Sequence, residues 1–158
     1  IGASSPSDYG AYFAWGATTP KDTYTEENSK TYEKELGDIS GPPQYDAARA
    51  NWGGSWRLPS EAEFEELRNQ CTWTWAIQGG HKGYQVTGSN GNSIFLPAAG
   101  CRYLSLSADE GDCGYYWSSS PNENYTQYAY GLGFDSNGHN VCWGGCNNNE
   151  FSIRPVSE

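Results

Sequence analysis

Apolar and polar positions in the first half of the chain follow two spacings. The alternating aromatic run Y-G-A-Y-F-A-W-G at residues 9–16 predicts an early strand. Residues 21–42 are polar and mixed in charge, so we expect a long solvated loop there without a binding role. In the run Y-D-A-A-R-A-N-W that follows, Tyr45, Ala48 and Trp52 share one face at helical spacing. This pattern predicts a short helix.

A second short helix is predicted by the run R-L-P-S-E-A-E-F-E-E-L-R-N-Q-C. Ser60 and Glu63 have the S-x-x-E spacing of a capping box, in which each side chain satisfies a backbone N–H of the other at a helix start. Phe64, Leu67 and Cys71 follow at the spacing of a buried stripe. The remaining glutamates of this run fall largely on the outer face, where they favour the N-terminal half of the helix dipole.

After Cys71 the pattern becomes typical of strands. The runs Y-Q-V-T-G, S-I-F-L-P, Y-G-L-G-F-D and E-F-S-I-R-P-V read as short strands, and S-N-G-N, S-N-G-H and G-G-C-N-N-N read as turns. No internal repeat is present. Two early helices and many late strands predict an α+β fold in a single domain over residues 1–158.

Composition and charge narrow the classes of partner. The chain has seven Trp, twelve Tyr and five Phe, enough aromatic area for a core, and a formal charge of −10. From Gly114 onward Arg154 is the only basic residue, so no basic stripe exists for nucleic acid or an anionic membrane surface. No apolar run approaches the ~20 residues of a membrane span, which predicts no membrane insertion.

The five cysteines favour an exported protein, and their odd number leaves at least one thiol unpaired. Cys71 is expected to be a buried thiol. Cys101 and Cys113 are one candidate disulfide. Cys142 and Cys146 are another, if the two glycines between them form a tight turn, because four residues of regular strand would hold them about 13 Å apart. The pairing stays open at this stage.

Several blocks together carry a resemblance that extends from about Tyr9 to Val156. They are Y-D-A-A-R-A-N-W, W-G-G-S-W-R-L-P-S-E-A-E-F-E-E-L, N-G-N-S-I-F-L-P-A-A-G-x-R, Y-W-S-S-S and F-S-I-R-P-V. The chain resembles C-type-lectin-fold domains, among them paralogous surface domains of Bacteroidetes and Fibrobacter and the variable proteins of diversity-generating retroelements. The formylglycine-generating enzyme is a more distant relative in that fold. The resemblance implies two short helices, twisted antiparallel sheets and long loops, with a ligand surface on the later strands.

Catalytic interpretations find little support in the residues. The enzyme relative is an oxidase that uses two cysteines and copper, and Cys142 and Cys146 invite that comparison, but its calcium-site and substrate-loop blocks have no match here. A zinc site at His139, Cys142 and Cys146 lacks a fourth ligand. A hydrolase built from Ser118–Ser120, His139 and Asp135 lacks a G-x-S-x-G elbow. We therefore expect no enzyme activity and no catalytic or metal-ligating residues.

Calcium is the familiar cofactor of sugar-binding lectins of this fold, and we expect none here while keeping it as a lesser alternative. The run S-P-N-E-N only faintly resembles the lectin motif. A calcium site needs several converging oxygens, which Asn122, Glu123, Asn124 and Asp135 offer only if folding brings them together.

The region 114–151 is the candidate binding region. A sparse apolar frame runs through residues 114–158: Trp117, Ala129, Leu132, Phe134, Val141, Trp143, Phe151, Ile153 and Val156. Tyr, Gly, Asn and Cys fill many of the positions between. One interpretation is an exposed, turn-rich surface in which Asn and Gly supply positive φ angles. The resemblance implies another, since retroelements mutate template adenines and so turn asparagine codons into Tyr, Cys, Gly, Ser, Asp or His, never into Trp or Glu.

Both interpretations lead to the same mechanism, because tyrosine anchors with small adaptable neighbours also dominate antibody paratopes. We expect ligand contacts at Tyr115, Tyr125, Tyr128, Tyr130, Asp135, His139, Cys142, Trp143, Gly144, Gly145, Cys146 and Asn147.

The expected function is that of an extracellular ligand-binding module, displayed at a bacterial or phage surface and diversified by a retroelement, with a protein or glycan as ligand. The alternative is a structural or adhesin subunit such as a pilus tip, and a remote alternative is the copper oxidase. No signal-peptide pattern is present in the chain, so the expected localisation rests on the resemblance. The ligand and the oligomeric state do not follow from the sequence.

Overall fold

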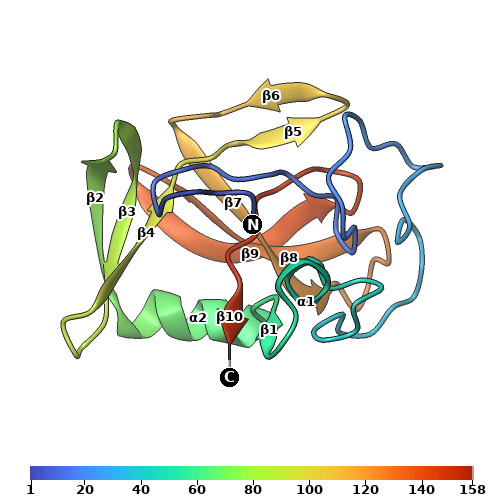
Figure 1. The fold of residues 1–158 in the computed structure, drawn as a ribbon, viewed down its shortest axis with the longest axis horizontal. Helices are drawn as coiled ribbons and strands as arrows, with labels where there is room; N and C mark the ends of the chain where they lie inside the picture. The colour runs from blue at the N-terminus through green and yellow to red at the C-terminus, as the bar shows by residue number, and fades with distance from the viewer. Residues whose placement is uncertain (158) are drawn as a thin grey trace.

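The computed structural model describes residues 1–157, and the side chains of residues 142–144 lie outside that description. Its helices are α1 (Ala47–Trp52) and α2 (Glu61–Gln70). Its strands are β1 (Trp56–Arg57), β2 (Thr72–Gln78), β3 (His81–Thr87), β4 (Ser93–Pro97), β5 (Cys101–Tyr103), β6 (Leu106–Ala108), β7 (Cys113–Pro121), β8 (Tyr128–Asp135), β9 (Gly138–Cys146) and β10 (Val156–Ser157). They pair antiparallel in four sheets, ordered β1-β10, β2-β3-β4, β5-β6 and β7-β8-β9. The α+β prediction is therefore confirmed (Figure 1).

Helix α2 begins as its sequence predicts. The Ser60 hydroxyl accepts from the Glu63 backbone N–H at 3.2 Å, and Glu63 accepts from the Ser60 N–H at 2.8 Å, which completes the capping box. Arg57 donates to both oxygens of the Glu63 carboxylate at 2.8 Å, and this lowers the pKa of Glu63 to about 2. Phe64 is the buried residue of the helix, and Leu67 and Cys71 pack partly buried beside it.

One hydrophobic core lies between α2, the β2-β3-β4 sheet and the β7-β8-β9 sheet. Its buried members are Phe64, Tyr84, Val86, Leu96, Ala98, Tyr116, Leu132 and Phe134. The rings of Tyr84 and Phe134 meet edge to face with centroids 5.4 Å apart. This core fixes β8 and β9, the strands on which most predicted contact residues lie.

A second core joins the two ends of the chain. The backbones of Phe13 and Phe151 exchange two hydrogen bonds of 3.0 Å, and Trp15 donates its backbone N–H to the Asn147 carbonyl at 2.9 Å. The indole of Trp117 stacks on Phe151 with centroids 4.2 Å apart and donates to the Phe13 carbonyl at 2.8 Å. Residues far apart in sequence thus share one buried aromatic cluster.

Helix α1 depends on a buried carboxylate. Asp46 is fully buried and accepts four backbone hydrogen bonds, from Gly41 and Leu58 at one oxygen and from Ala48 and Arg49 at the other. A buried charge is tolerated when it is satisfied in this way. Asp46 therefore caps α1 and also holds the chain segments on either side of it.

Several local predictions are wrong. The run at residues 9–16 forms only an isolated bridge at Phe13, because a single hydrogen-bonded pair with Phe151 anchors it. Cys71, expected to be a buried thiol, is only partly buried. The short helix predicted in the run that ends at Trp52 is, by contrast, confirmed as α1, and Trp52 itself is 49% exposed and meets Trp56 edge to face. The run at the C-terminus forms bridges and the short β10 rather than one continuous strand.

The candidate disulfide between Cys101 and Cys113 does not form, and the Cys142 side chain of the other candidate pair lies outside the described residues. Cys71, Cys101, Cys113 and Cys146 are free thiols, each partly buried. Burial raises the pKa of both Cys101 and Cys113. Within residues 1–157, no helix is long and apolar enough to cross a membrane.

Candidate functional site

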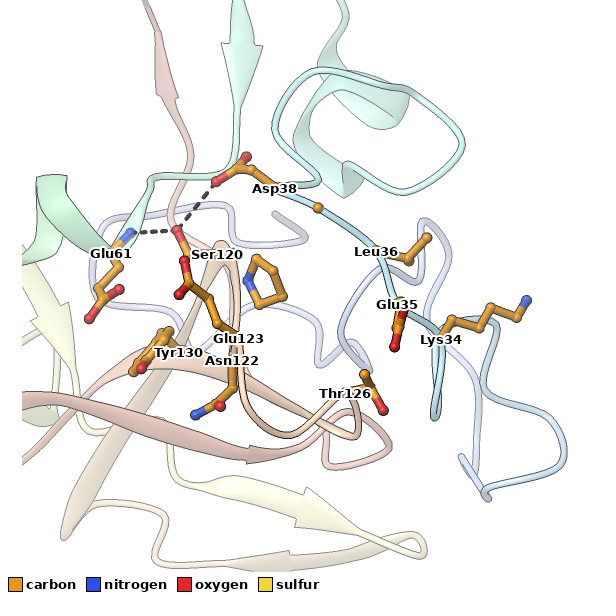
Figure 2. A pocket seen from close by; sticks show the side chains of 12 residues that line it. Lys34, Glu35, Leu36, Asp38, Glu61, Ser120, Asn122, Glu123, Thr126 and Tyr130 are labelled. Atoms are coloured by element: carbon orange, nitrogen blue, oxygen red, sulfur yellow. Dashed lines mark hydrogen bonds between the residues drawn. The ribbon is translucent and has the colours of Figure 1, made fainter.

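A cleft of about 820 Å³ opens where the loop at residues 34–38, the start of α2 and the end of β7 meet the β7–β8 connection (Figure 2). Tyr130 of β8 forms part of its lining, and Thr126 lies on the opposite side. The cleft therefore adjoins β8, which carries three of the predicted contact residues, Tyr128, Tyr130 and Asp135.

Hydrogen bonds to Asp38 hold one wall of the cleft together. The hydroxyls of Ser119 and Ser120 donate to the same Asp38 oxygen at 2.9 and 3.3 Å. The Ser120 hydroxyl in turn accepts from the Glu61 backbone N–H at 3.1 Å, at the first residue of α2 (Figure 2). The loop, the strand and the helix are thus fixed relative to one another.

The β7–β8 connection owes its shape to a buried asparagine. Asn122 is 4% exposed, and its side-chain oxygen accepts from the backbone N–H groups of Asn124 at 2.9 Å and Tyr125 at 3.1 Å. Such a side-chain turn fixes the backbone without secondary structure. It presents Tyr125 at 48% exposure, with the Tyr128 ring perpendicular to it at a centroid distance of 6.3 Å.

The cleft is acidic. Four carboxylates, from Glu35, Asp38, Glu61 and Glu123, line it together with the single cation Lys34. Burial raises the pKa of Glu61, and the charges of Glu65 and Glu123 add to that effect. The site favours a ligand that brings hydrogen-bond donors or positive charge.

The structure brings four of the predicted contact residues together beside this cleft. Tyr128 of β8 pairs with Cys146 of β9, and Tyr130 follows two residues along the same strand, on the same face. Contact with Cys146 raises the pKa of the Tyr128 phenol. With Tyr125 these residues form what we call the tyrosine cluster: Tyr125, Tyr128, Tyr130 and Cys146.

Asp135 and His139 lie at the other end of the same strands, roughly 23 Å along β8 from Tyr128. Asp135 accepts from the backbone of the β8–β9 turn at 2.7 and 3.2 Å, so its carboxylate shapes the turn. The His139 ring stacks on Trp73 with centroids 4.2 Å apart, and burial together with nearby Arg68 lowers its pKa. These two residues do not share a surface with the tyrosine cluster.

Three further predicted contacts serve the fold instead. Asn147 is fully buried and donates to the Thr126 carbonyl at 3.0 Å. Gly145 has φ of 130°, and a Cβ there would lie 2.6 Å from the Asn149 side chain, so no larger residue fits without strain. Tyr115 is half-buried and stacks on Phe151. Burial raises its pKa strongly.

The remaining predicted contacts, Cys142, Trp143 and Gly144, lie on β9, and their side chains are outside the described residues. The alternating register of β8 and β9 places the backbone of residue 143 opposite Tyr130.

The alternative chemistries considered from the sequence do not assemble. His139 and Cys146 are seven residues apart on β9, roughly 20 Å, so they do not share a zinc ion. Asp135 lies roughly 20 Å along β8 from Ala129. Ala129 pairs with Pro121, which directly precedes Asn122. The four candidate calcium ligands therefore do not converge. The Ser118 hydroxyl donates to the Tyr130 carbonyl at 2.8 Å and is used by the fold. Among the described side chains, no three His, Cys, Asp or Glu residues form a metal-binding group.

The wall formed by residues 34–38 was not predicted from the sequence, because this segment was expected to be solvated. Two apolar residues within that polar stretch, Leu36 and Ile39, could have indicated that it packs against a core. Ile39 is 2% exposed in the aromatic core, and Leu36 packs partly buried against the same core. Tyr24 and Thr31, earlier in the predicted loop, are also buried. The segment is irregular, as predicted, but its apolar residues anchor it beside the cleft.

Comparison with protein families gives one match. Residues 81–156, just under half of the chain, match a family described as a domain of unknown function, DUF8237. No curated protein matches the chain, and no solved structure does. The matched stretch runs from β3 to β10 and includes the tyrosine cluster but not α1, α2 or the loop at residues 34–38.

Proposed function

We propose that this chain is a ligand-binding module with a C-type-lectin-like arrangement, which captures a protein or glycan at the tyrosine cluster and the adjoining cleft. The observation that carries the proposal is the convergence of Tyr125, Tyr128 and Tyr130 beside a cleft of about 820 Å³ whose walls are hydrogen-bonded in place. A pre-formed concave site with exposed aromatic residues is the usual setting of recognition.

The division of β7, β8 and the closing segment into frame and surface supports this proposal. Six of the nine frame residues are buried: Trp117, Ala129, Leu132, Phe134, Phe151 and Ile153. Val141 and Val156 are partly buried, and the side chain of Trp143 lies outside the described residues. On β8, Tyr128 and Tyr130 alternate with buried Ala129 and Gly131. A substitution at either tyrosine leaves the core contacts of its neighbours in place, which is the property that a binding surface on a rigid frame requires.

The chemistry of the site favours a polar ligand. Tyrosine offers a flat apolar ring and a hydroxyl with little conformational entropy to lose, and the carboxylates of the cleft accept hydrogen bonds. Sugar hydroxyls, backbone amides and basic side chains all supply the matching donors. We propose binding without chemical transformation. A structural subunit of the pilus-tip kind is less well supported, because its surface needs neither the cleft nor the cluster.

Retroelement diversification remains part of the proposal, over fewer positions. Asn147 and Gly145 are constrained by the fold, so we propose the positions of the tyrosine cluster as the diversified ones. The genomic neighbourhood tests this point. A nearby reverse transcriptase, with a template repeat that matches residues 100–158 except at adenines, is the expected finding. Its absence would remove diversification and leave a surface-displayed binding protein.

A binding experiment tests the site itself. The purified protein is screened on a glycan array and on a yeast-displayed panel of bacterial and host surface proteins, and each hit is measured by surface plasmon resonance. Replacing Tyr128 and Tyr130 together by alanine should weaken binding at least ten-fold. The matched control is Tyr103→Ala, which removes a tyrosine of 51% exposure on the β5–β6 hairpin and should leave affinity within about two-fold. Equal affinity of the double variant and the wild type would rule out this surface.

A further inference from the structure

A second groove, of about 560 Å³, lies on a different part of the molecule and shares no lining residue with the acidic cleft. Strand β4 forms one side of it. Trp52 and Trp56, from α1 and β1, and the segment before β10 form the other sides. Although the chain carries nineteen acidic residues, none of those that the structure describes lines this groove, and Arg154 is the charged residue among its described lining.

Strand β4 is an open edge. In its sheet the strand order is β2-β3-β4, and within residues 1–157 no other strand or bridge pairs with β4. Four consecutive residues of β4, from Ser93 to Leu96, line the groove. Successive side chains of a strand point to opposite faces, so a run of consecutive lining residues means that the strand edge itself meets the groove.

The β3–β4 register identifies which backbone groups point outward. The Gly88 N–H donates to the Asn92 carbonyl at 2.9 Å, and the Ala98 N–H donates to the Lys82 carbonyl at 2.8 Å. Hydrogen-bonded pairs alternate with non-bonded pairs in an antiparallel ladder, so positions 94 and 96 bond to β3 and positions 93, 95 and 97 point away.

Residue 97 agrees with this assignment. It is Pro97, which has no N–H to lose, and its carbonyl accepts from the hydroxyl of Tyr116. The backbone groups of Ser93 and Phe95 are therefore the ones aimed at the groove. Phe95 is 5% exposed and lies at its base, whereas Ser93 is exposed at its mouth.

Large apolar side chains flank this edge. Trp52, Trp56 and Ile94 are 49%, 37% and 51% exposed, and the two indoles meet edge to face with centroids 5.0 Å apart. Exposed apolar groups around an open strand edge are features that natural proteins usually avoid unless a partner covers them.

We propose that this groove binds an extended peptide segment of another protein, which adds to β4 as a fourth strand. The peptide backbone exchanges hydrogen bonds with Ser93 and Phe95, an apolar side chain packs on Trp56, and an acidic side chain faces Arg154. Affinity in this mode comes from backbone pairing, and specificity comes from pockets for alternate side chains. A second copy of this chain suits the groove less well, because two chains of charge −10 repel each other.

The experiment uses a random heptapeptide library displayed on phage and selected on the whole protein. The best peptide is synthesised with a fluorescent label, and its dissociation constant is measured by anisotropy. Ser93→Pro removes one outward N–H and leaves the β3–β4 ladder bonds in place, so we expect at least ten-fold weaker binding. Ser93→Ala is the matched control. It keeps the N–H, loses only the 3.3 Å contact with Gln85, and should bind within about two-fold of the wild type.

A measurement on the unaltered protein guards against misfolding of the proline variant. Hydrogen exchange of the wild type with and without the peptide should show slowed exchange at the amides of Ser93 and Phe95. The proposal is overturned if no peptide is enriched, if the proline and alanine variants bind equally, or if protection appears elsewhere. It is also overturned if sedimentation shows a dimer that Ser93→Pro dissociates. The result is independent of the tyrosine cluster, since Tyr128→Ala should leave peptide affinity unchanged.

Discussion

The buried frame and the tyrosine cluster share strand β8 but differ in role: the frame stabilises the fold, and the cluster is available to a ligand. On β8, Leu132 and Phe134 are 1% and 5% exposed beneath α2, whereas Tyr128 and Tyr130 lie on the same side of the strand beyond the start of that helix. The helix covers one end of this face and leaves the other end open beside the cleft. Coverage by a neighbouring element, more than residue type, decides which positions hold the fold and which are available to a ligand.

Trp117→Ala, a substitution in the buried frame, should cause the largest loss of stability. The side chain is completely buried, stacks on Phe151 and donates to the Phe13 carbonyl. We expect a loss of about 4 kcal/mol in the free energy of unfolding, mainly from the cavity that the indole leaves, because the Phe13 carbonyl still accepts from the Phe151 backbone N–H. Urea denaturation measures this. A loss below about 1 kcal/mol would show that the aromatic core does not hold the frame.

Asn147 should behave as frame even though its sequence position predicts a ligand contact. Asn147→Ala removes a fully buried side chain together with its hydrogen bonds to the carbonyls of Thr126 and Thr31, so we expect about 2 kcal/mol of destabilisation in thermal denaturation. Asn124→Ala, at an exposed position of the β7–β8 connection, is the control and should change stability little. If Asn147→Ala instead kept its stability and lost ligand binding, Asn147 would be a ligand contact as the sequence predicts.

The start of α2 borders both regions, and its stability should depend on pH. The Arg57 guanidinium lowers the pKa of Glu63 from 4.5 to about 2. A carboxyl whose folded pKa is lowered stabilises the fold fully above its unfolded pKa, so this contribution should disappear as pH falls from about 4.5 to about 2. Denaturation of Glu63→Gln and the wild type across that range tests it. The variant should show the flatter pH dependence, and parallel curves would contradict the assignment.

The smallest effect on stability should come from the tyrosine cluster. Replacing Tyr128 and Tyr130 together by alanine should cost about 1 kcal/mol or less, because neither side chain is part of either core. Thermal melting of the same variant used for binding provides the measurement. A loss of several kcal/mol would place these residues in the frame and remove the distinction between the two regions.

Local signals in the sequence predicted much of the frame. The capping box at Ser60, the stripe through Phe64 and the strand at residues 93–97 depend on neighbouring residues alone, and all three are confirmed. Likewise, the apolar residues of the C-terminal third follow strand alternation, so the burial of Leu132 and Phe134 was predictable. These features require no knowledge of which elements later meet.

The cleft was not predictable in the same way. Its lining brings together Asp38, Glu61 and Ser120. These residues are tens of positions apart in sequence and meet only through tertiary packing. Gly145 and Asn147 were assigned to the surface because Gly and Asn are common in loops. The role of Gly145 depends on a positive φ angle, and that of Asn147 depends on burial of its side chain against carbonyls of other segments. Residue type alone does not distinguish these cases.

The pairing of Phe13 with Phe151 has a consequence for how the protein folds. This contact closes a loop of well over one hundred residues. Closing such a loop slows folding, because the chain loses conformational entropy before the stabilising contacts of the core have formed. On the ribosome, the backbone N–H groups of Phe13 and Trp15 lack their acceptors, the carbonyls of Phe151 and Asn147, until those residues have been synthesised. The α2 core can form earlier around local hairpins, but the aromatic core that joins the two ends has to wait for the last strands to emerge.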